Sequence, residues 1–381
     1  MAKVKEQNIA VFGESGSGKT VLVSSFYGAT QESTFREHNL YKLVADDTGQ
    51  GTRLRQNYLK MKNSAQAPAP TVFAAPSYSF TLKPKDGKDP NELPFGALRL
   101  VWHDYPGEWF EQDPSSDEEA ARRVDTFTKL LKSDVALILV DGQKLLDYAG
   151  EEEKYLKSLL WGIGGALEKL KDDILLNGER LAEFPRIWVL ALSKSDLHPN
   201  LDVNAFHDLI VEKAAGDVAA LHETLKGFVQ VPKAMSIGED FMLLSSAKFQ
   251  PGKIEVTQRV GLDLIFPVAS MLPLERVAQW AEQFDLPLNV LSALVDNSQT
   301  LARVLTGVAA GFLAKVPFVG PFLAPLVIPA LEEAARLGTS KLEEIHTQAL
   351  KDRDYLTATL TQFRLDLDRG VQDHLLVKSQ R

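Results

Sequence analysis

Cysteine is absent from this chain of 381 residues, which excludes disulfides, thiolate metal sites and cysteine nucleophiles. Histidine is scarce: its 7 residues form no His-x-x-x-His pair, so we do not expect a structural zinc site. An excess of basic charge is also missing, since 42 Lys and Arg stand against 51 Asp and Glu. We therefore expect no nucleic-acid partner, because phosphate backbones bind basic surfaces.

The segment Met1 to Gln7 lacks the apolar core of a secretion signal, so we expect a cytoplasmic protein, at most peripheral to the inner membrane. In the apolar segment 304–331, neither uncharged part, 304–314 or 316–331, reaches the about 18 residues that a helix needs to span a bilayer. The least polar segment, 304–331, is interrupted by Lys315 and carries a proline every four residues from Pro317 to Pro329. Each interior proline would cost a straight helix about 3 kcal/mol, so this segment predicts an apolar helical hairpin.

A complete phosphate-binding loop, G-x-x-x-x-G-K-[ST], is present in the chain. It consists of Gly13, Glu14, Ser15, Gly16, Ser17, Gly18, Lys19 and Thr20. The apolar run 8–12 predicts a buried strand before the loop, and a helix begins at Thr20 and Val21, which is the context that the motif requires.

Glycine lets backbone N–H groups turn toward an anion at the helix N-terminus. Lys19 is expected to reach the terminal phosphates, and the Thr20 hydroxyl to ligate Mg²⁺. The alternative, a Gly/Ser-rich turn with a chance Lys-Thr, does not account for the flanking strand and helix. Residues 13–21 therefore predict a nucleoside triphosphate site.

The rest of the pattern predicts an α/β fold of the P-loop NTPase type, a mostly parallel sheet with helices on both faces. Residues 77–83 alternate in polarity and are expected to pair with 97–102 as the antiparallel edge. Apolar runs at 135–140, 187–192 and 241–245 alternate with helical patterns, as in parallel sheets. We expect one nucleotide-binding domain over 1–285, with a long polar insertion at 31–76. No strand pattern recurs later, so 286–381 predicts an all-α C-terminal domain.

Ligands bind such sheets at the carboxyl ends of the strands, and short motifs follow three of the predicted strands. Asp104 is placed to hold Mg²⁺ through water, and Gly107 can bring a backbone N–H to a γ-phosphate. Ser193, Lys194 and Asp196 follow the predicted strand at 187–192. The Asp196 carboxylate can accept two hydrogen bonds from guanine, whereas adenine has no such donor pair.

The stem of Lys194 would cover the base, and the backbone of Ser246, Ala247 and Lys248, after the last strand, can contact guanine O6. A plain turn or a helix cap would explain each motif alone. Four motifs in this order, each at a strand end, instead predict GTP or GDP as the ligand, with Mg²⁺.

The set of motifs resembles the translation-factor-related class of P-loop GTPases, which includes the Ras-like proteins, over about two-thirds of the chain. The string from Asp104 to Trp109, DYPGEW, is similar to that of the bacterial YcjX-like GTPases. This resemblance implies GTP hydrolysis and a switch threonine that closes over Mg²⁺ and the γ-phosphate. Thr71 occupies that place best, with Thr48 and Thr52 as alternatives because the preceding insertion is long.

Most members of the class carry Gln after the switch glycine, where this chain has Glu108. A carboxylate can accept a hydrogen bond from the attacking water, but it repels the γ-phosphate. Glu108 therefore positions the water or marks slow turnover, while Lys19 and Gly107 stabilise the developing charge. Gly16 stands where potassium-activated members carry Asn, so we expect no potassium dependence.

An arginine finger cannot be assigned from the sequence. The long insertion offers Arg36, Arg53 and Arg55, and a partner could equally supply one. We expect a molecular switch that relays its nucleotide state to the helical C-terminal domain and to a protein effector; the sequence indicates neither that effector nor the oligomeric state. The alternatives are a dynamin-like GTPase that meets the membrane through 304–331, and a slow-turnover GTP-binding scaffold. General burial favours a hairpin packed inside the helical domain.

Overall fold

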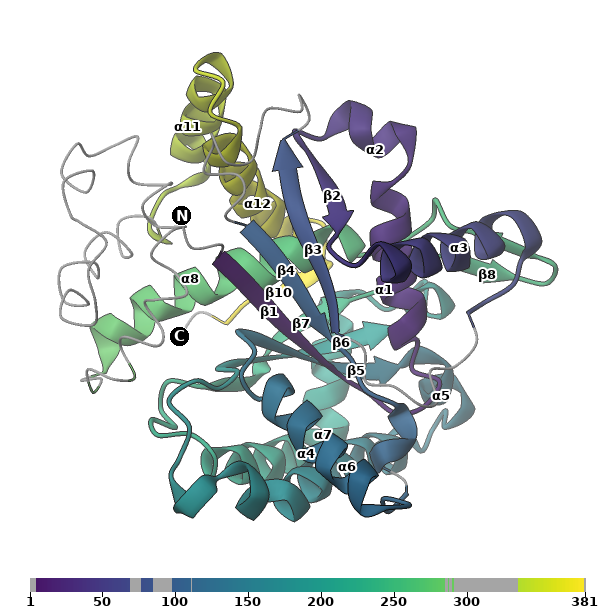
Figure 1. Cartoon of the computed structure of the whole chain (residues 1–381), viewed down its shortest axis with the longest axis vertical. Coiled ribbons are helices and arrows are strands. Elements are labelled where there is room, and N and C mark those ends of the chain that lie inside the picture. Colours follow the sequence, from purple (N-terminus) through teal and green to yellow (C-terminus); the bar gives the residue numbers. More distant parts are fainter. Residues whose placement is uncertain are drawn as a thin grey trace.

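The computed structural model describes residues 5–68, 77–84, 98–110, 112–284, 287, 290 and 335–379. Within these residues lies an eight-stranded sheet in the order β10-β7-β6-β5-β1-β4-β3-β2 (Figure 1). Its strands are β1 (Lys5–Phe12), β2 (Tyr41–Ala45), β3 (Ser77–Pro84), β4 (Leu98–His103), β5 (Val135–Asp141), β6 (Ile187–Ser193), β7 (Ser236–Leu243) and β10 (Leu376–Val377). The five central strands run parallel, and antiparallel pairs lie at both edges. The mostly parallel α/β sheet predicted from the sequence is confirmed.

Alternate residues of the central strands enter two separate apolar cores. Ile9 and Val11 of β1 face one core, whereas Ala10 and Phe12 face the other. Every residue of β5 and β6 is buried, as expected for strands that helices cover on both sides.

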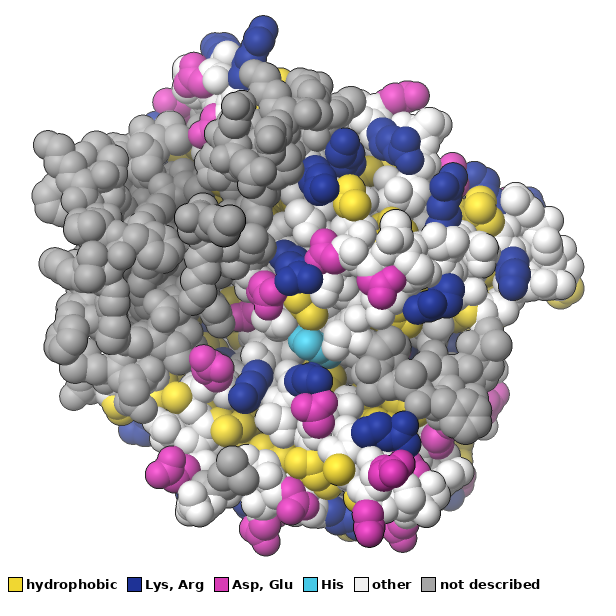
Figure 2. Space-filling model, viewed as in Figure 1, with side chains coloured by type: hydrophobic (Ala, Val, Ile, Leu, Met, Phe, Trp, Pro, Cys, Tyr) yellow, Lys and Arg dark blue, Asp and Glu magenta, His cyan; other side chains and the backbone are white. Residues whose placement is uncertain are grey.

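Helices α4 (Asp117–Leu130), α6 (Glu152–Ile174) and α7 (Val203–Lys226) cover one face of the sheet, at the bottom of Figure 1. Helices α1 (Lys19–Thr30), α8 (Ile265–Gln283) and α12 (Tyr355–Gln372) cover the other face. Acidic and basic side chains are interspersed on the described part of the surface shown in Figure 2.

The predicted insertion contains regular structure that we did not predict from its weak periodicity. It holds α2 (Ser33–His38), β2 and α3 (Thr48–Ser64). Strand β3 pairs with β4 as predicted, but it is not the edge, because β2 pairs antiparallel with its outer side. Helix α3 packs on α1, burying Leu54, Tyr58 and Met61. The prediction that 77–83 forms the edge of the sheet is therefore wrong, because the edge strand is β2.

The described C-terminal residues share the sheet and core of the preceding part. Helices α11 (Thr339–Lys351) and α12 pack together, and α12 also packs against α8, with Leu360 and Phe363 in the same core as Ile9. Strand β10 pairs antiparallel with β7. The domain boundary at 285/286 stays a prediction, and the apolar hairpin at 304–331, with the dynamin-like alternative that rests on it, lies outside the described residues. None of the described helices combines the length and the hydropathy needed to cross a membrane.

A buried ion pair anchors the chain after β10. Arg276 of α8 and Asp240 of β7 lie 2.6 Å apart, with side chains 2% and 0% exposed. The backbone N–H of Ser379 donates to the same carboxylate at 3.1 Å, and Arg276 donates to the Ser379 carbonyl at 3.1 Å. Residues from β7, α8 and the C-terminal segment are thus held at one point.

Candidate functional site

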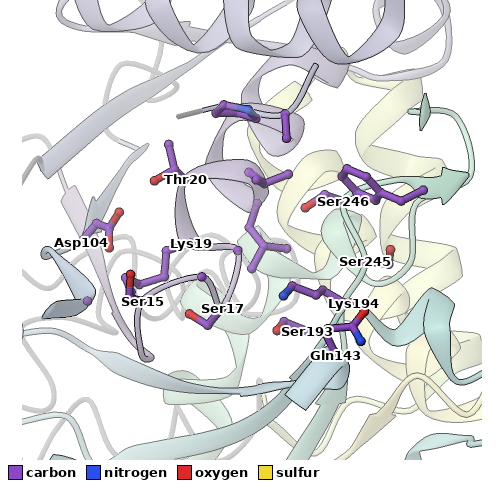
Figure 3. Close-up of a pocket in the computed structure, with 18 of the residues that line it drawn as sticks. Ser15, Ser17, Lys19, Thr20, Asp104, Gln143, Ser193, Lys194, Ser245 and Ser246 are labelled. Atoms are coloured by element: carbon purple, nitrogen blue, oxygen red, sulfur yellow. The ribbon is translucent and has the colours of Figure 1, made fainter. Parts of the chain in front are cut away.

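A cavity of about 430 Å³ lies at the carboxyl ends of the parallel strands. Among the residues predicted from sequence, those that line it are Ser15, Gly16, Ser17, Gly18, Lys19, Thr20, Val21, Asp104, Gly107, Glu108, Ser193, Lys194, Asp196 and Ser246. Figure 3 shows Lys19, Thr20 and Asp104 at one side of the cavity and Lys194 and Ser246 at the other. The structure therefore brings the four predicted motifs to one site.

The loop between β1 and α1 is shaped by its glycines. Gly16 and Gly18 have φ angles of 82° and 92°, in the left-handed region that glycine adopts without strain. The ammonium group of Lys19, whose residue is only 7% exposed, donates hydrogen bonds to the carbonyl oxygens of Gly13 at 2.7 Å and Glu14 at 3.1 Å. The lysine charge is thus held directly over the loop.

Tyr105, which the sequence did not single out, joins this loop to the end of β4. Its hydroxyl accepts a hydrogen bond from the Gly13 N–H and donates one to the Gly13 carbonyl oxygen. The Lys19 ammonium lies 5.0 Å from the centre of the Tyr105 ring, which places a cation over an aromatic face. Tyr105 therefore contacts both the loop and its lysine.

Asp104 is buried beside this loop, and one of its two carboxylate oxygens has no hydrogen-bond partner. The residue is 2% exposed, and Oδ1 accepts a hydrogen bond from the Tyr105 N–H at 2.8 Å. The other oxygen, Oδ2, has no hydrogen-bond partner. Burial raises the pKa of Asp104 to about 6, although the Lys19 charge opposes that rise.

An orphaned carboxylate oxygen next to a phosphate-binding loop fits a cation such as Mg²⁺, which takes hard oxygen ligands. Thr20 lines the same cavity and offers a hydroxyl. The described residues contain no group of three or more His, Asp or Glu for a metal. Mg²⁺ needs none, because it keeps several waters and binds one or two carboxylates plus phosphate oxygens.

Gly107 and Glu108 begin a short 3₁₀ helix, Gly107–Phe110, after β4. A Cβ atom on Gly107 would lie 2.3 Å from the backbone N of Ser15, so only glycine allows this approach. Glu108 is half-buried and lines the cavity. The segment after β4 is therefore packed directly on the phosphate-binding loop.

At the other end of the cavity, the Asp196 carboxylate is oriented by two donors. Oδ1 accepts a hydrogen bond from the Ser245 hydroxyl at 2.7 Å, and Oδ2 accepts from the Phe249 N–H at 3.4 Å. Lys194 adopts a left-handed φ of 53°, and its ammonium donates to Asp141 at 2.8 Å. The carboxylate predicted to recognise guanine is thus oriented by protein donors on both of its oxygens.

The turn after β7 borders the cavity with part of the predicted trio. Ser245 and Ser246 line the cavity, but Ala247 and Lys248 do not. Ala247 is fully buried in a small apolar cluster, while Lys248 is exposed. Ser246 of the predicted trio therefore lines the cavity, together with Ser245 before it.

Some predicted residues lie away from the cavity or outside the described residues. Thr71 falls outside them. Thr48 and Thr52 lie in the first turns of α3 and do not line the cavity, and the Thr52 hydroxyl donates to the Thr48 carbonyl. Arg36, Arg53 and Arg55, on α2 and α3, do not line it either.

Further residues that line the cavity were not predicted: Leu22, Ala67, Pro68, Tyr105, Gln143, Leu197, Ser245 and Phe249. Tyr105 and Phe249 could have been found, because each lies inside or next to a recognised motif. No sequence signal marks Gln143, which lies just after β5 at the start of α5 (Gly142–Asp147).

Comparison with known proteins finds one family model that matches most of the sheet-forming part. The family, described as Double-GTPase 2, matches residues 7–230. No curated protein sequence matches the chain.

Several solved structures are distantly similar. Translation elongation factor SelB from Methanococcus maripaludis, with the GTP analogue GppNHp, is 13% identical at a TM-score of 0.26, covering 64% of this chain and 31% of that one. Roco2 RocCORdC from Methanosarcina barkeri, bound to GDP, is 10% identical with a TM-score of 0.27, and the match covers 77% of this chain and 62% of that chain. An Era variant from Aquifex aeolicus, bound to GDP and AlF4−, is 16% identical with a TM-score of 0.25, and the match covers 75% of this chain and 70% of that chain.

Proposed function

Because the chain belongs to the Double-GTPase 2 family, we propose that it is a molecular switch that binds GTP and hydrolyses it to GDP and phosphate. The family confirms the P-loop GTPase class predicted from the four motifs, and the similarity to YcjX-like GTPases is consistent with it.

One observation carries the proposal: a single cavity has the Lys19 ammonium at one end and the Asp196 carboxylate at the other. Its volume of about 430 Å³ is in the usual range for small-molecule sites. The cation suits a polyphosphate, and the carboxylate suits the two donors on the guanine edge. Adenine has no such donor pair to offer the Asp196 carboxylate.

In the reaction, Lys19 would exchange its bonds to the Gly13 and Glu14 carbonyls for bonds to the terminal phosphates. Backbone N–H groups among residues 15–20, which line the cavity, would bind the remaining phosphate oxygens. Thr20 and Asp104 would hold Mg²⁺, which, when bound, neutralises charge on the phosphates. Thr71 remains the proposed switch threonine.

Glu108 is the proposed water-positioning group, since it lines the cavity next to Gly107. The expected result for Glu108→Ala is a fall of about 100-fold or more in single-turnover hydrolysis at saturating Mg²⁺, with unchanged GTP affinity. Glu118→Ala, on the exposed first turn of α4, is the matched control. Unchanged or faster turnover in Glu108→Ala would favour the second candidate, a slow-turnover GTP-binding scaffold, because the carboxylate would then only repel the γ-phosphate.

The base assignment is tested by measuring GTP and ATP affinity for the wild type and Asp196→Ala. We expect a strong preference for GTP that Asp196→Ala abolishes, and no such effect from Asp208→Ala, a carboxylate on α7 whose side chain is 80% exposed. Equal affinity for ATP, surviving the Asp196 substitution, would refute guanine recognition.

We also propose that the nucleotide state reaches the C-terminal helices through β7. Ser245 at the base end exchanges two backbone hydrogen bonds of 2.9 Å with Val260, just before α8, and α8 packs against α12. Hydrogen–deuterium exchange of α8 and α12 should therefore differ between the GTP-analogue and GDP complexes. Identical exchange in both complexes would rule out this relay.

A further inference from the structure

Hydrogen bonds to Asp196 would recognise only the edge of a bound base, but a base also has two flat faces. In the described part of the cavity wall, two side chains are aromatic rings, those of Tyr105 and Phe249. Tyr105 is 1% exposed, and its hydroxyl is bonded to Gly13 at the phosphate end. Phe249 is 39% exposed, and its N–H lies 3.4 Å from the Asp196 carboxylate. The aromatic ring at the base end is therefore that of Phe249.

The position of Phe249 is fixed by a short hairpin of β8 (Lys248–Gln250) and β9 (Lys253–Glu255). Phe249 lies directly opposite Ile254, so both side chains are on the same face of the hairpin. Ile254 is only 8% exposed and packs in a small apolar cluster with Tyr58 and Met61 of α3. The hairpin face that carries Phe249 is thus anchored to α3.

Val21 connects this apolar cluster to the cavity. It packs against the cluster that contains Ile254, and it also lines the cavity. The ring of Phe249 therefore stands at the border between an anchored apolar cluster and an open cavity. A phenylalanine with this exposure gains free energy when a flat ligand removes its face from water.

We propose that the Phe249 ring stacks on the base of the bound nucleotide while the Lys194 stem covers the other face. Phe249 is then a binding residue that holds any purine by its face, and Asp196 selects guanine by its edge. The inference rests on the proposed function, because it assumes that a guanine nucleotide occupies this cavity.

Stacking and edge recognition predict different responses to changes in the base. Guanine, hypoxanthine and xanthine differ at the edge but offer similar π-faces. A substitution of Phe249 should therefore lower the affinities for GDP, IDP and XDP by similar factors. A substitution of Asp196 should change the ranking of the three.

The experiment measures these affinities by calorimetry for the wild type, Phe249→Ala, Phe249→Leu and Phe249→Trp. We expect Phe249→Ala to weaken all three nucleotides by about 5- to 150-fold, which corresponds to about 1–3 kcal/mol per stacked base. Phe249→Trp should restore affinity, with tryptophan fluorescence quenched by GDP, and Phe249→Leu should restore little. The affinity for inorganic tripolyphosphate should stay unchanged, because it has no base.

Trp161→Ala on α6, where the side chain is 59% exposed, is the control for loss of a surface aromatic residue. Three results would overturn the inference: wild-type affinity in Phe249→Ala, full rescue by Phe249→Leu, or an equal loss of tripolyphosphate binding. Wild-type affinity in Phe249→Ala leaves the proposed function intact if the wild type prefers GDP over ADP. A wild type without guanine preference instead refutes the proposed function itself.

Discussion

The hydroxyl of Tyr105 holds Gly13 by both of its backbone polar groups, accepting from the N–H at 2.7 Å and donating to the carbonyl at 3.0 Å. Gly13 is the first residue of the phosphate-binding loop, and Tyr105 follows the strand that ends at Asp104. A single side chain therefore couples the start of the loop to the segment that carries Asp104 and Gly107.

Removing this hydroxyl should affect both stability and phosphate binding. Tyr105→Phe leaves the buried Gly13 N–H without an acceptor, so we expect the free energy of unfolding to fall by about 1–3 kcal/mol. The affinity for inorganic tripolyphosphate should fall as well, because the loop loses its anchor. Tyr155→Phe is a matched control, since that hydroxyl also accepts from a buried backbone N–H, that of Asp141 at 2.7 Å rather than that of Gly13. An equal loss of phosphate binding in both variants would contradict a specific role for Tyr105.

Asp104→Asn should stabilise the protein without ligand and weaken its response to Mg²⁺. Burial raises the pKa of this carboxyl from 3.8 to about 6, so the ionised form present at pH 7.5 disfavours folding. Removing the charge should raise the free energy of unfolding by up to about 3 kcal/mol in EDTA, while Asn still accepts from the Tyr105 N–H. The Mg²⁺-dependent gain in GDP affinity should be lost.

Thermal melting in EDTA and titration of GDP with and without Mg²⁺ measure the two effects. Asp113→Asn, at a side chain that is 89% exposed, should change neither. A less stable Asp104→Asn protein would mean that the fold, rather than a cation, requires this carboxylate.

Gly107→Ala should impair nucleotide binding through a steric clash. The new Cβ would lie 2.3 Å from the backbone N and 2.5 Å from the Cα of Ser15, so the segment after β4 or the loop must move. We expect at least a 10-fold loss of GTP affinity or hydrolysis. Gly165→Ala in α6, where a Cβ meets no atom within 4 Å, should instead stabilise the protein by about 0.5–1 kcal/mol. Normal binding and turnover in Gly107→Ala would show that this approach is dispensable.

His103 should contribute to the pH dependence of stability. Its Nε2 contacts Asn8 Oδ1 and its Nδ1 contacts the Ser77 hydroxyl, both at 2.9 Å, which ties β4 to β1 and β3. Asn8 Oδ1 can only accept, so Nε2 donates and Nδ1 accepts, as in a neutral ring. Burial, aided by the Lys129 charge, lowers the pKa of His103 from 6.5 to about 4.

As the pH falls, His103 is protonated in the unfolded chain before it is protonated in the folded protein. The stability that neutral His103 contributes is therefore complete above pH 6.5 and is lost as the pH falls toward 4. Melting temperatures at pH 7.5 and pH 5 should therefore differ less in His103→Gln than in the wild type. His38→Gln, on the exposed helix α2, should keep the wild-type difference. An unchanged difference in His103→Gln would disprove this role.

Elements with a strong local pattern could be predicted from the sequence. The runs at 135–140 and 187–192 are apolar throughout because both faces of their strands are covered, and the structure buries all of β5 and β6. The phosphate-binding loop was predicted because a strand, glycines at fixed spacing and a helix occur together.

Elements that depend on distant partners could not be predicted in the same way. Strand β10 has two residues and exists because β7 offers it an edge. Helix α3 did carry a signal, since Leu54, Tyr58 and Met61 follow helical spacing, but polar residues surround them. The insertion therefore appeared irregular although α3 packs on α1.

The candidate site shows the same limit at the level of single residues. The short motif at 246–248 predicts a turn at this site but not which of its residues line the cavity. In the structure, Ser245 bonds to Asp196 and Ala247 turns into the apolar cluster. Phe249 reaches the cavity because the β8–β9 hairpin packs on α3, a contact between segments far apart in the sequence.

The attachment of residues 376–379 to β7 also has a consequence for synthesis on the ribosome. Ser379 and Asp240 are 139 positions apart, so one edge of β7 stays unpaired while that intervening length is translated. An open strand edge invites pairing with other chains, and domains otherwise begin to fold as they emerge. The nascent chain can thus assemble its phosphate-binding loop early, yet it completes the pairing of β7 only after residues 376–377 have been made.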